Sequence, residues 1–541
     1  MSLTVGAGRR VLVVVRTVTT LSRLLDVLSL TAGDRRIQTV FTHDVRRRST
    51  LAAGVDEALR DLGGSMVPWD EAIGTRFDLA LAASENDGLA ELNAPVLLMP
   101  HGAGFQKFYP GTSVVAGMDP DRLVVDGRVV PAAIALPHHS DLVQLREISP
   151  AAAPFGAVVG DPALARMRGS RFRAPYLRSA LGARGRRVVV VASTYGPDSV
   201  LGRLPELPER LVAALPADEY QVVVVLHPGV WAAHGPWQVR AWLSQAAAYG
   251  VRVVAPHEGW QAALLAASVV ISDHGSLAVY ATALGKPVLL AGRGSAVTVP
   301  GSAAAMLAGT APVWDPVSDP RKQLEAAIDG HDPASEQQVT AEQQVTADQQ
   351  VTADDCAPRL RALVYRLLDL PEPAAPAEFA PVPAPPPVGG TVPGWVAGAE
   401  ILPDGVRVER YPDPGTGPPH DGLAYRHLVA DERTGSLTRL GSADILVTDL
   451  RAAGSVRRWV EGAPEQLSAW PQTTMLAAVV DEWSCVIRTR AGAHLLTADD
   501  LIDPVLLASL AHVRLAATGQ LPSRDRLYLG DRSIAVAVAA G

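Results

Sequence analysis

The sequence predicts an α/β protein in which two doubly wound parallel sheets face a cleft and a small α+β unit follows them. Three observations support this fold class. Short apolar runs alternate with amphipathic helical stretches over roughly the first 330 of the 541 residues, the alternation restarts after Gly160, and the composition changes near residue 395. At about 100–200 residues per domain, this length allows roughly three domains.

The first unit, residues 1–155, is predicted to be a Rossmann-like domain. Its apolar runs are short and rich in Val, Ile, Leu and Ala, and segments between them carry leucines at helical spacing, as at Leu21, Leu24 and Leu28. Apolar runs separated by helices are typical of parallel strands that are buried on both faces. The predicted strands are Val11–Val15, Ile37–Phe41, Leu79–Ala83, Pro95–Pro100, Ala132–Leu136 and Ala157–Val159.

The second unit, residues 156–333, repeats this pattern and is predicted to be a second Rossmann-like domain. Helical stretches again separate the apolar runs. Ligands of such sheets bind beyond the carboxyl ends of the strands, so two facing units predict a ligand cleft between them. The predicted strands are Val188–Val191, Val222–Leu226, Val251–Val254, Val269–Ser272 and Val288–Leu290.

The rest of the chain is predicted to contain linkers, one helix and a third domain. Three copies of a six-residue unit (EQQVTA, EQQVTA, DQQVTA) indicate a low-complexity linker over residues 334–355. An amphipathic helix over 356–370 and a Pro- and Ala-rich linker over 371–394 follow. Residues 395–541 show both alternating and helical periodicity, which favours a small α+β domain whose role the sequence does not reveal.

Composition excludes several classes of protein. The net charge of −8 argues against a nucleic-acid partner, and two cysteines exclude a disulfide framework and a cysteine-based zinc site. We expect no bound metal and no cofactor. No apolar run is long enough to span a membrane or to act as a signal sequence, which predicts a cytoplasmic protein. Peripheral membrane association stays open, and the only basic run in the first unit is the small Arg46–Arg48 cluster. The sequence also leaves the oligomeric state open.

The first candidate site residues follow the predicted strand that ends near Pro100. His101 stands at the carboxyl end of this strand, where an imidazole with a pKa near the working pH is well placed to accept a proton from a hydroxyl group. Gly102 allows a ligand to approach the backbone closely, and Lys107 is one of only three lysines in the chain. We therefore predict His101 as the catalytic base and place Gly102 and Lys107 on the acceptor side of the cleft.

Strand ends of the second unit supply the remaining candidates. Thr194 follows its first strand and is predicted to line the cleft, and His227 follows its second strand, where an imidazole can donate to phosphate oxygens. The segment Ser272-Asp273-His274-Gly275-Ser276 precedes a predicted helix, and free N–H groups at a helix N-terminus favour anions. We predict that His227, Asp273, Gly275 and Ser276 bind the phosphates of a donor.

In this order, the motifs resemble those of the CDP-glycerol glycerophosphotransferases of teichoic acid synthesis, a family of GT-B fold. The family's His-Gly-Thr-Pro-x-Lys motif is similar to residues 101–107, and its Thr-Asp-Tyr-Ser-Ser motif is similar to residues 272–276. The chain departs from the family pattern in two places, because Tyr280 replaces an acidic residue and the arginine before His227-Pro228 is missing. Further similar segments are Gly160-Asp161-Pro162, Ala192-Ser193-Thr194-Tyr195, Val225-Leu226-His227-Pro228 and Gly285-Lys286-Pro287.

The resemblance implies a transferase that moves a glycosyl or polyol-phosphate group from a nucleotide-activated donor to a hydroxyl acceptor. The donor would be CDP- or UDP-linked. Two alternatives remain open at this stage. The first is a non-catalytic nucleotide-binding or regulatory protein of the same fold, which the two departures favour. The second is a nucleotide-sugar 2-epimerase, a family that shares the Gly-Lys-Pro segment but requires an acid/base carboxylate set.

Overall fold

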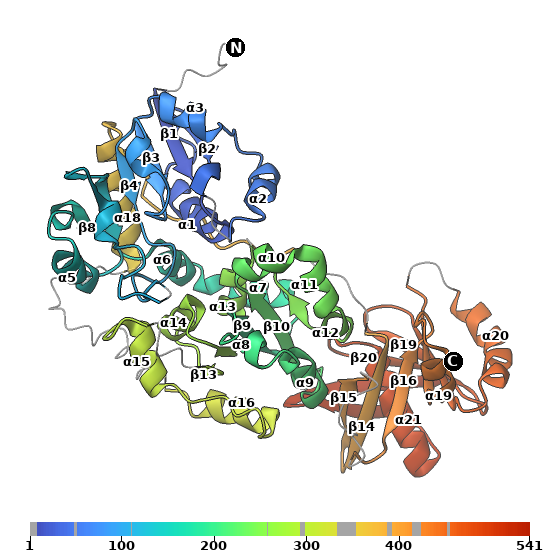
Figure 1. Cartoon of the computed structure of the whole chain (residues 1–541). Coiled ribbons are helices and arrows are strands. Elements are labelled where there is room, and N and C mark those ends of the chain that lie inside the picture. Colours follow the sequence, from blue (N-terminus) through green and yellow to red (C-terminus); the bar gives the residue numbers. More distant parts are fainter. Residues whose placement is uncertain are drawn as a thin grey trace.

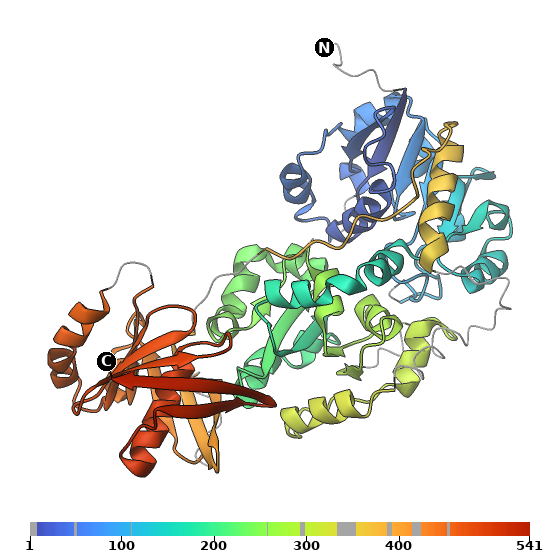
Figure 2. The ribbon, with the colours of Figure 1, turned by 180° about the vertical axis from the view of Figure 1, so that it is seen from behind.

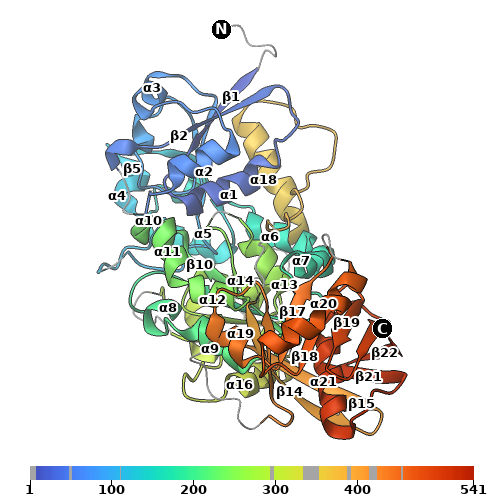
Figure 3. The same cartoon turned by 90° about the vertical axis from the view of Figure 1, so that its right-hand side faces the viewer.

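The protein consists of three bodies in a row, with the second unit between the first unit and a C-terminal body (Figures 1 and 3). The computed structural model describes residues 8–47, 51–109, 111–256, 258–292, 298–332, 353–386, 392–413, 423–451 and 455–540. The six-residue repeats lie outside these ranges except for their last residue, Ala353.

The first unit is built on a six-stranded sheet in which every strand pair is parallel. The order of the strands reverses between β1 and β3, which are neighbours. Its strands, in sheet order, are β2 (Ile37–Thr42), β1 (Arg9–Val14), β3 (Leu79–Ala82), β4 (Val96–Leu98), β7 (Pro131–Leu136) and β8 (Gly156–Val158). The helices and 3-10 turns are α1 (Val18–Leu28), η1 (Val45–Arg47), α2 (Val55–Leu62), α3 (Trp69–Gly74), η2 (Leu89–Glu91), α4 (Pro120–Leu123), α5 (His139–Ile148) and η3 (Ala153–Phe155), and β5 (Val124–Val125) and β6 (Arg128–Val129) form a small hairpin.

The second unit holds a five-stranded sheet, which is also parallel throughout. Val188–Val191 have no exposed surface, as expected of a central strand that is covered on both faces. Its strands, in sheet order, are β11 (Arg252–Val253), β10 (Tyr220–Leu226), β9 (Arg187–Ser193), β12 (Val269–Ser272) and β13 (Val288–Leu290). Its helices and one 3-10 turn are α6 (Pro162–Gly169), η4 (Arg171–Arg173), α7 (Ala174–Ala180), α8 (Val200–Arg203), α9 (Leu207–Ala214), α10 (Pro228–His234), α11 (Pro236–Trp242), α12 (Ser244–Ala248), α13 (Trp260–Ala266), α14 (Ser276–Ala283), α15 (Ala303–Thr310) and α16 (Pro320–Asp329).

Helix α18 (Ala353–Leu367) returns from the second unit to the first one (Figure 2). Its buried Leu360, Leu363 and Val364 belong to the apolar core beneath one face of the first sheet. The chain after α18 then follows the surfaces of both units. Phe379 packs on the core of the first unit, and the backbone N–H of Val382 donates to Ser170 Oγ of the second unit at 3.0 Å.

The C-terminal body corrects one expectation, because nine strands close into a barrel where the sequence predicts an α+β domain. Strands β19 (Ser484–Arg488) and β20 (Ala493–Ala498) form a local hairpin, but the barrel closes through pairs that are distant in sequence, such as β15 (Gly405–Pro412) with β21 (Arg524–Leu529). Helix α21 packs into the barrel core through Leu506, Leu507 and Leu510. The strands, in barrel order, are β14 (Gly394–Leu402), β15 (Gly405–Pro412), β21 (Arg524–Leu529), β22 (Arg532–Ala540), β20 (Ala493–Ala498), β19 (Ser484–Arg488), β18 (Met475–Val479), β17 (Ile445–Asp449) and β16 (His427–Asp431), and the helices are α19 (Leu437–Ser442), α20 (Val456–Ala469) and α21 (Val505–Thr518).

Candidate active site between the two units

Asp273 joins two loops of the second unit at the point where the order of its strands reverses. It follows β12, and Thr194 follows the neighbouring β9. The buried carboxylate of Asp273 accepts hydrogen bonds from Thr194 N (2.8 Å), Thr194 Oγ1 (2.9 Å), Val200 N (3.1 Å) and Gly275 N (3.0 Å). Because the carboxylate already accepts these bonds from the protein, Asp273 would contribute to ligand binding by fixing the loops that carry Thr194 and Gly275. Direct binding of a donor by Asp273 stays a prediction.

The start of helix α14 lies against the His101 loop of the first unit. Ser276, the first residue of α14, accepts a hydrogen bond through Oγ from the backbone N–H of Ala103 at 3.4 Å. A Cβ atom on Gly102 would lie 2.8 Å from Ser276 Oγ, and one on Gly275 would lie 2.6 Å from the Thr194 side chain. Neither position has room for a Cβ atom unless the neighbouring side chain moves.

The loop after His101 reaches further into the second unit. The backbone of Lys107 forms an antiparallel bridge with Thr298. The carbonyl oxygen of Gln106 accepts from Val299 N, and its side-chain Oε1 accepts from Ala304 N at the start of α15, both at 2.9 Å. The predicted residues Gly102 and Lys107 thus lie where the first unit contacts the second.

His227 has a fixed orientation and a lowered pKa. Its Nδ1 accepts a hydrogen bond from the backbone N–H of Gly229 at 2.9 Å, so the neutral ring carries its proton on Nε2. Burial, together with the nearby charges of Lys107 and His101, lowers the pKa of His227 to about 3. The ring is therefore neutral at pH 7 and presents Nε2–H as a donor.

His101 and Lys107 also have lowered pKa values, and neighbouring carboxylates oppose the shift. The His101 side chain is open to solvent, yet the protein around it lowers the pKa of its imidazole, while the Glu85 carboxylate acts in the opposite direction. Burial lowers the pKa of Lys107, and Asp273 partly offsets this effect. We call the group His101, Lys107, Thr194, His227 and residues 273–276 the inter-unit site.

Glu85 was not predicted as a site residue, although it lies close enough to influence His101. It follows β3 at the strand-order reversal of the first sheet, which is the position that Asp273 has in the second sheet. It is buried and accepts hydrogen bonds from the Tyr109 hydroxyl and from the backbone N–H of Gly117 (2.7 Å). The signal was present in the sequence, because Glu85 stands two residues after the apolar run that ends at Ala83.

Asp141 is a second carboxyl group that the sequence analysis did not single out. It accepts a hydrogen bond from the backbone N–H of His138 at 2.9 Å and lies beneath Gly104 of the His101 loop. Burial raises its pKa to about 7. No motif marks this residue, since it is brought to the loop by the packing of α5.

Tyr280, which departs from the family pattern, belongs to a buried network that joins the two units. Its hydroxyl donates to Asp161 Oδ2 at 2.7 Å and accepts from Arg23 Nη2 of helix α1 at 2.8 Å. Arg23 also donates through Nε to the His101 carbonyl at 3.1 Å. Asp26, one turn along α1, pairs with Arg166 of α6 at 2.7 Å. The tyrosine therefore connects α14 to the backbone that carries His101.

The space left between the units at this network is small. A cavity of about 20 Å³ borders Arg23, Gly102 and Asp161, which is room for about one water molecule. Within the described ranges, no cluster of three or more His, Cys, Asp or Glu side chains is arranged to hold a metal ion. In the same residues, no helix combines the length and apolarity that crossing a membrane requires. Peripheral association with a membrane stays a prediction.

Comparisons with known proteins find similar folds and no sequence relatives. No family model and no curated protein matches the chain. A structure of the wall teichoic acid polymerase TagF is 11% identical, covers 67% of this chain and 89% of its own, and has a TM-score of 0.45. The S. aureus MnaA–UDP co-structure is 11% identical over 69% and 100% of the two chains, with a TM-score of 0.39. Anabaena Alr3699/HepE in complex with UDP and glucose is 14% identical over 62% and 99%, with a TM-score of 0.33. With TM-scores below 0.5, no conclusion about this protein rests on these likenesses.

Proposed function

We propose that the protein is a transferase that moves a glycosyl or polyol-phosphate group from a nucleotide-activated donor to a hydroxyl acceptor. The observation that carries this proposal is the convergence of the inter-unit site. A solvent-open imidazole and a lysine from the first unit meet a neutral imidazole and a helix N-terminus from the second. A proton acceptor beside a cluster of phosphate-binding donors is what attack by a hydroxyl on an activated donor requires.

In the proposed reaction, His101 accepts the proton of the acceptor hydroxyl. Its lowered pKa keeps the imidazole neutral and able to take a proton at pH 7. The acceptor oxygen forms a bond to the transferred carbon or phosphorus atom as the bond to the nucleotide phosphate breaks. The negative charge then grows on the leaving phosphate, where Nε2–H of His227 and the first N–H groups of α14 stabilise it.

Substrate binding in this proposal requires the two units to move apart. The Ala103–Ser276 contact lies where the donor phosphates would bind, and the cavity at Arg23 has room for only one water molecule. Closure after binding would then exclude water from the reacting groups. The resemblance of the motifs favours a CDP-alditol among the CDP- and UDP-linked donors.

Thermal unfolding in the presence of nucleotides tests donor binding. CDP, UDP and their glycerol or sugar conjugates are each added to the full chain, and a true donor is expected to raise the unfolding temperature through mass action. Turnover is then measured with the stabilising compound and hydroxyl acceptors. If none of these compounds changes the unfolding temperature of the folded protein, the proposal is wrong.

A non-catalytic nucleotide-binding protein is the second candidate function. Tyr280 favours it, because this residue holds the units together through Arg23 and Asp161 where the resembling family has an acidic residue. Nucleotide-induced stabilisation without turnover of any conjugate would support this candidate over the transferase.

A further inference from the structure

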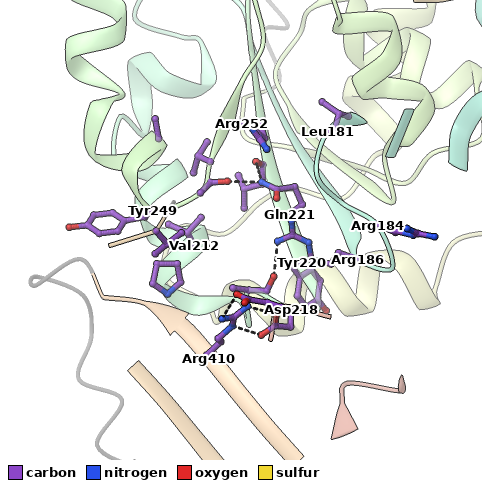
Figure 4. A pocket seen from close by; sticks show the side chains of 18 of the residues that line it. Leu181, Arg184, Arg186, Val212, Asp218, Tyr220, Gln221, Tyr249, Arg252 and Arg410 are labelled. Atoms are coloured by element: carbon purple, nitrogen blue, oxygen red, sulfur yellow. Dashed lines mark hydrogen bonds and ion pairs between the residues drawn. The ribbon is translucent and has the colours of Figure 1, made fainter. Parts of the chain in front are cut away.

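A cavity of about 1300 Å³ lies between the second unit and the barrel (Figure 4). Its wall on the second unit is formed at the beginnings of strands, since Arg186 precedes β9, Asp218 precedes β10 and Arg252 begins β11. Thr194 and Asp273 of the inter-unit site follow the other ends of strands in the same sheet. The cavity is therefore separated from the inter-unit site by the length of the sheet, and we call it the arginine cavity.

On the barrel side, two turns of the same sequence pattern line the cavity. Neighbouring parallel strands β16 and β17 both end in Val-x-Asp-x-Arg, with Asp431 and Arg433 in one turn and Asp449 and Arg451 in the other. In each turn, the aspartate accepts from the arginine backbone N–H (2.8 and 3.1 Å) and binds the guanidinium through Nε (2.9 Å in both) and Nη2 (2.6 Å in both). Two guanidinium groups are thus held at the carboxyl ends of parallel strands, which is the usual position of a ligand.

Positive charge exceeds negative charge around the cavity. Its lining contains eight arginines and six Asp or Glu side chains. Among the described residues, the side chains of Arg184 and Arg252 form no hydrogen bond or ion pair, and the Arg186 side chain donates only to the carbonyl oxygens of Gly182 and Ala217. Burial accordingly lowers the pKa values of Arg186 and Arg252. Asp218, Asp500 and Asp503 act on Arg184 and Arg186 electrostatically but form no ion pair with them, so an anion in the cavity could make the direct contact.

A buried ion pair joins the two bodies at the cavity, and part of the cavity wall is apolar. Arg410 of β15 is 5% exposed and forms a bidentate pair with Asp218 of the second unit at 2.8 and 2.9 Å (Figure 4). It also forms an ion pair with Asp503 at 2.7 Å. This buried pair holds the barrel against the second unit. The apolar surface of the cavity includes Trp395, Val429, Val447, Val479 and Leu506.

We propose that the arginine cavity binds an organic anion that carries a diphosphate or several phosphate groups. The planar guanidinium fork matches the geometry of phosphate oxygens, and Arg184 and Arg252 of the second unit offer such forks to the cavity. The aspartate-bound Arg433 and Arg451 line it from the barrel. The apolar walls accept the organic part of the ligand. This site goes beyond the proposed transferase function, because it uses none of the residues assigned to the inter-unit site.

Hydrogen exchange of the full chain locates the binding of two probes, inorganic pyrophosphate and ADP. Both are expected to slow amide exchange at residues 429–433 and 447–451. ADP is expected to bind more tightly than pyrophosphate, because its base can contact the apolar walls. Unchanged exchange at both segments in millimolar pyrophosphate and ADP would overturn the proposal. Equal affinities would overturn the organic part of it.

The double variant Arg184→Gln/Arg252→Gln tests the arginines directly. Neither side chain forms a hydrogen bond or an ion pair with the described residues, so the fold is expected to persist. Each lost charge-assisted contact is expected to weaken pyrophosphate binding about tenfold in calorimetry. Arg457→Gln on α20 is the matched control, since Arg457 lies outside the cavity and pairs with Glu461. Equal affinities of the double variant and the control would contradict the proposal.

A second variant separates this site from the inter-unit site. His227→Ala is expected to remove the exchange protection that a bound nucleotide conjugate gives to residues 273–277. The protection that ADP or pyrophosphate gives to residues 429–433 is expected to stay. The transferase proposal fails if no nucleotide conjugate is bound or turned over, whereas the cavity proposal fails if the two barrel segments do not respond. Hydrogen exchange in different segments of the chain therefore distinguishes the failure of one proposal from the failure of the other.

Discussion

His101 combines access to solvent with an imidazole that is neutral at pH 7, as a proton acceptor must be. Glu85 lies near enough to oppose the shift and is itself held by two hydrogen bonds. Its fixed negative charge would stabilise the imidazolium that forms when His101 accepts a proton. The pair therefore gives the first unit a proton acceptor and a stabilising charge at two neighbouring strand ends.

Replacing His101 tests this role at the level of a single residue. His101→Ala is expected to reduce turnover by about 10²–10⁴-fold, because the acceptor hydroxyl loses its proton acceptor. Donor affinity, measured by calorimetry, is expected to change little, since the phosphate-binding groups belong to the second unit. His234→Ala, a histidine at the end of α10, serves as the control. Turnover equal to that of the wild type would exclude His101 as the base.

The low pKa of His227 makes a prediction about stability and pH. The folded state holds the pKa near 3, whereas the unfolded chain has the ordinary value near 6.5, so only the unfolded chain takes up a proton between these values. Stability is therefore lost as the pH falls below about 6.5. In denaturant titrations at pH 7.5 and 4.5, His227→Gln is expected to lose about 1–2 kcal/mol less than the wild type. Equal losses would show that His227 is not buried as a neutral ring.

Helix α14 combines two roles in one element. Its first residue contacts the His101 loop through Ser276, and Tyr280, one turn further along, binds Arg23 and Asp161. The same helix thus offers its N-terminus to an anion and fixes the first unit beside it. Changes in Tyr280 are for this reason expected to affect the contact between the units before they affect the chemistry.

Tyr280→Phe tests this network with the removal of one oxygen atom. The variant leaves Arg23 Nη2 and Asp161 Oδ2 without their shared partner in a buried environment, which is expected to cost about 1–3 kcal/mol of stability. The unfolding temperature reports the loss. Tyr176→Phe is the matched control, because Tyr176 is 56% exposed. A Tyr280 variant as stable as the control would mean that the network does not hold the units together.

At the scale of the whole molecule, buried ion pairs connect bodies that are far apart in sequence. Asp26 and Arg166 join the first and second units, and Asp218 and Arg410 join the second unit to the barrel. Helix α18 adds apolar contact on the first sheet after the chain has completed the second. Each body is thereby held by charge pairs whose partners lie more than one hundred residues away.

Asp218→Asn is expected to weaken the contact between the second unit and the barrel. It leaves the buried Arg410 with only Asp503 as a charged partner, and breaking a buried pair in this way costs about 3 kcal/mol. Thermal unfolding measures the effect. Glu461→Gln on the exposed surface of α20 is the control and is expected to cause no measurable change. If both variants unfold at the wild-type temperature, Arg410 does not depend on Asp218.

The two parallel sheets were predictable because strands that are buried on both faces must be apolar throughout, and such runs are visible in the sequence. Candidate residues at strand ends, such as His101 and Asp273, were predictable for the same reason, since parallel sheets bring these ends to one edge. The barrel was not predictable from periodicity. Strands β16 to β18 alternate with helices as in an α/β unit, and pairing of β15 with β21 depends on segments more than one hundred residues apart.

The sequence by itself determined the strands of the two parallel sheets and the polar residues that follow them, because these features depend on local periodicity. Only the tertiary structure decided that the Asp273 carboxylate is occupied by backbone N–H groups, that Tyr280 connects the two units, and that eight arginines surround one cavity. Each of these depends on contacts between residues distant in sequence. Such contacts follow from the packing of whole elements, which no local pattern of residues encodes.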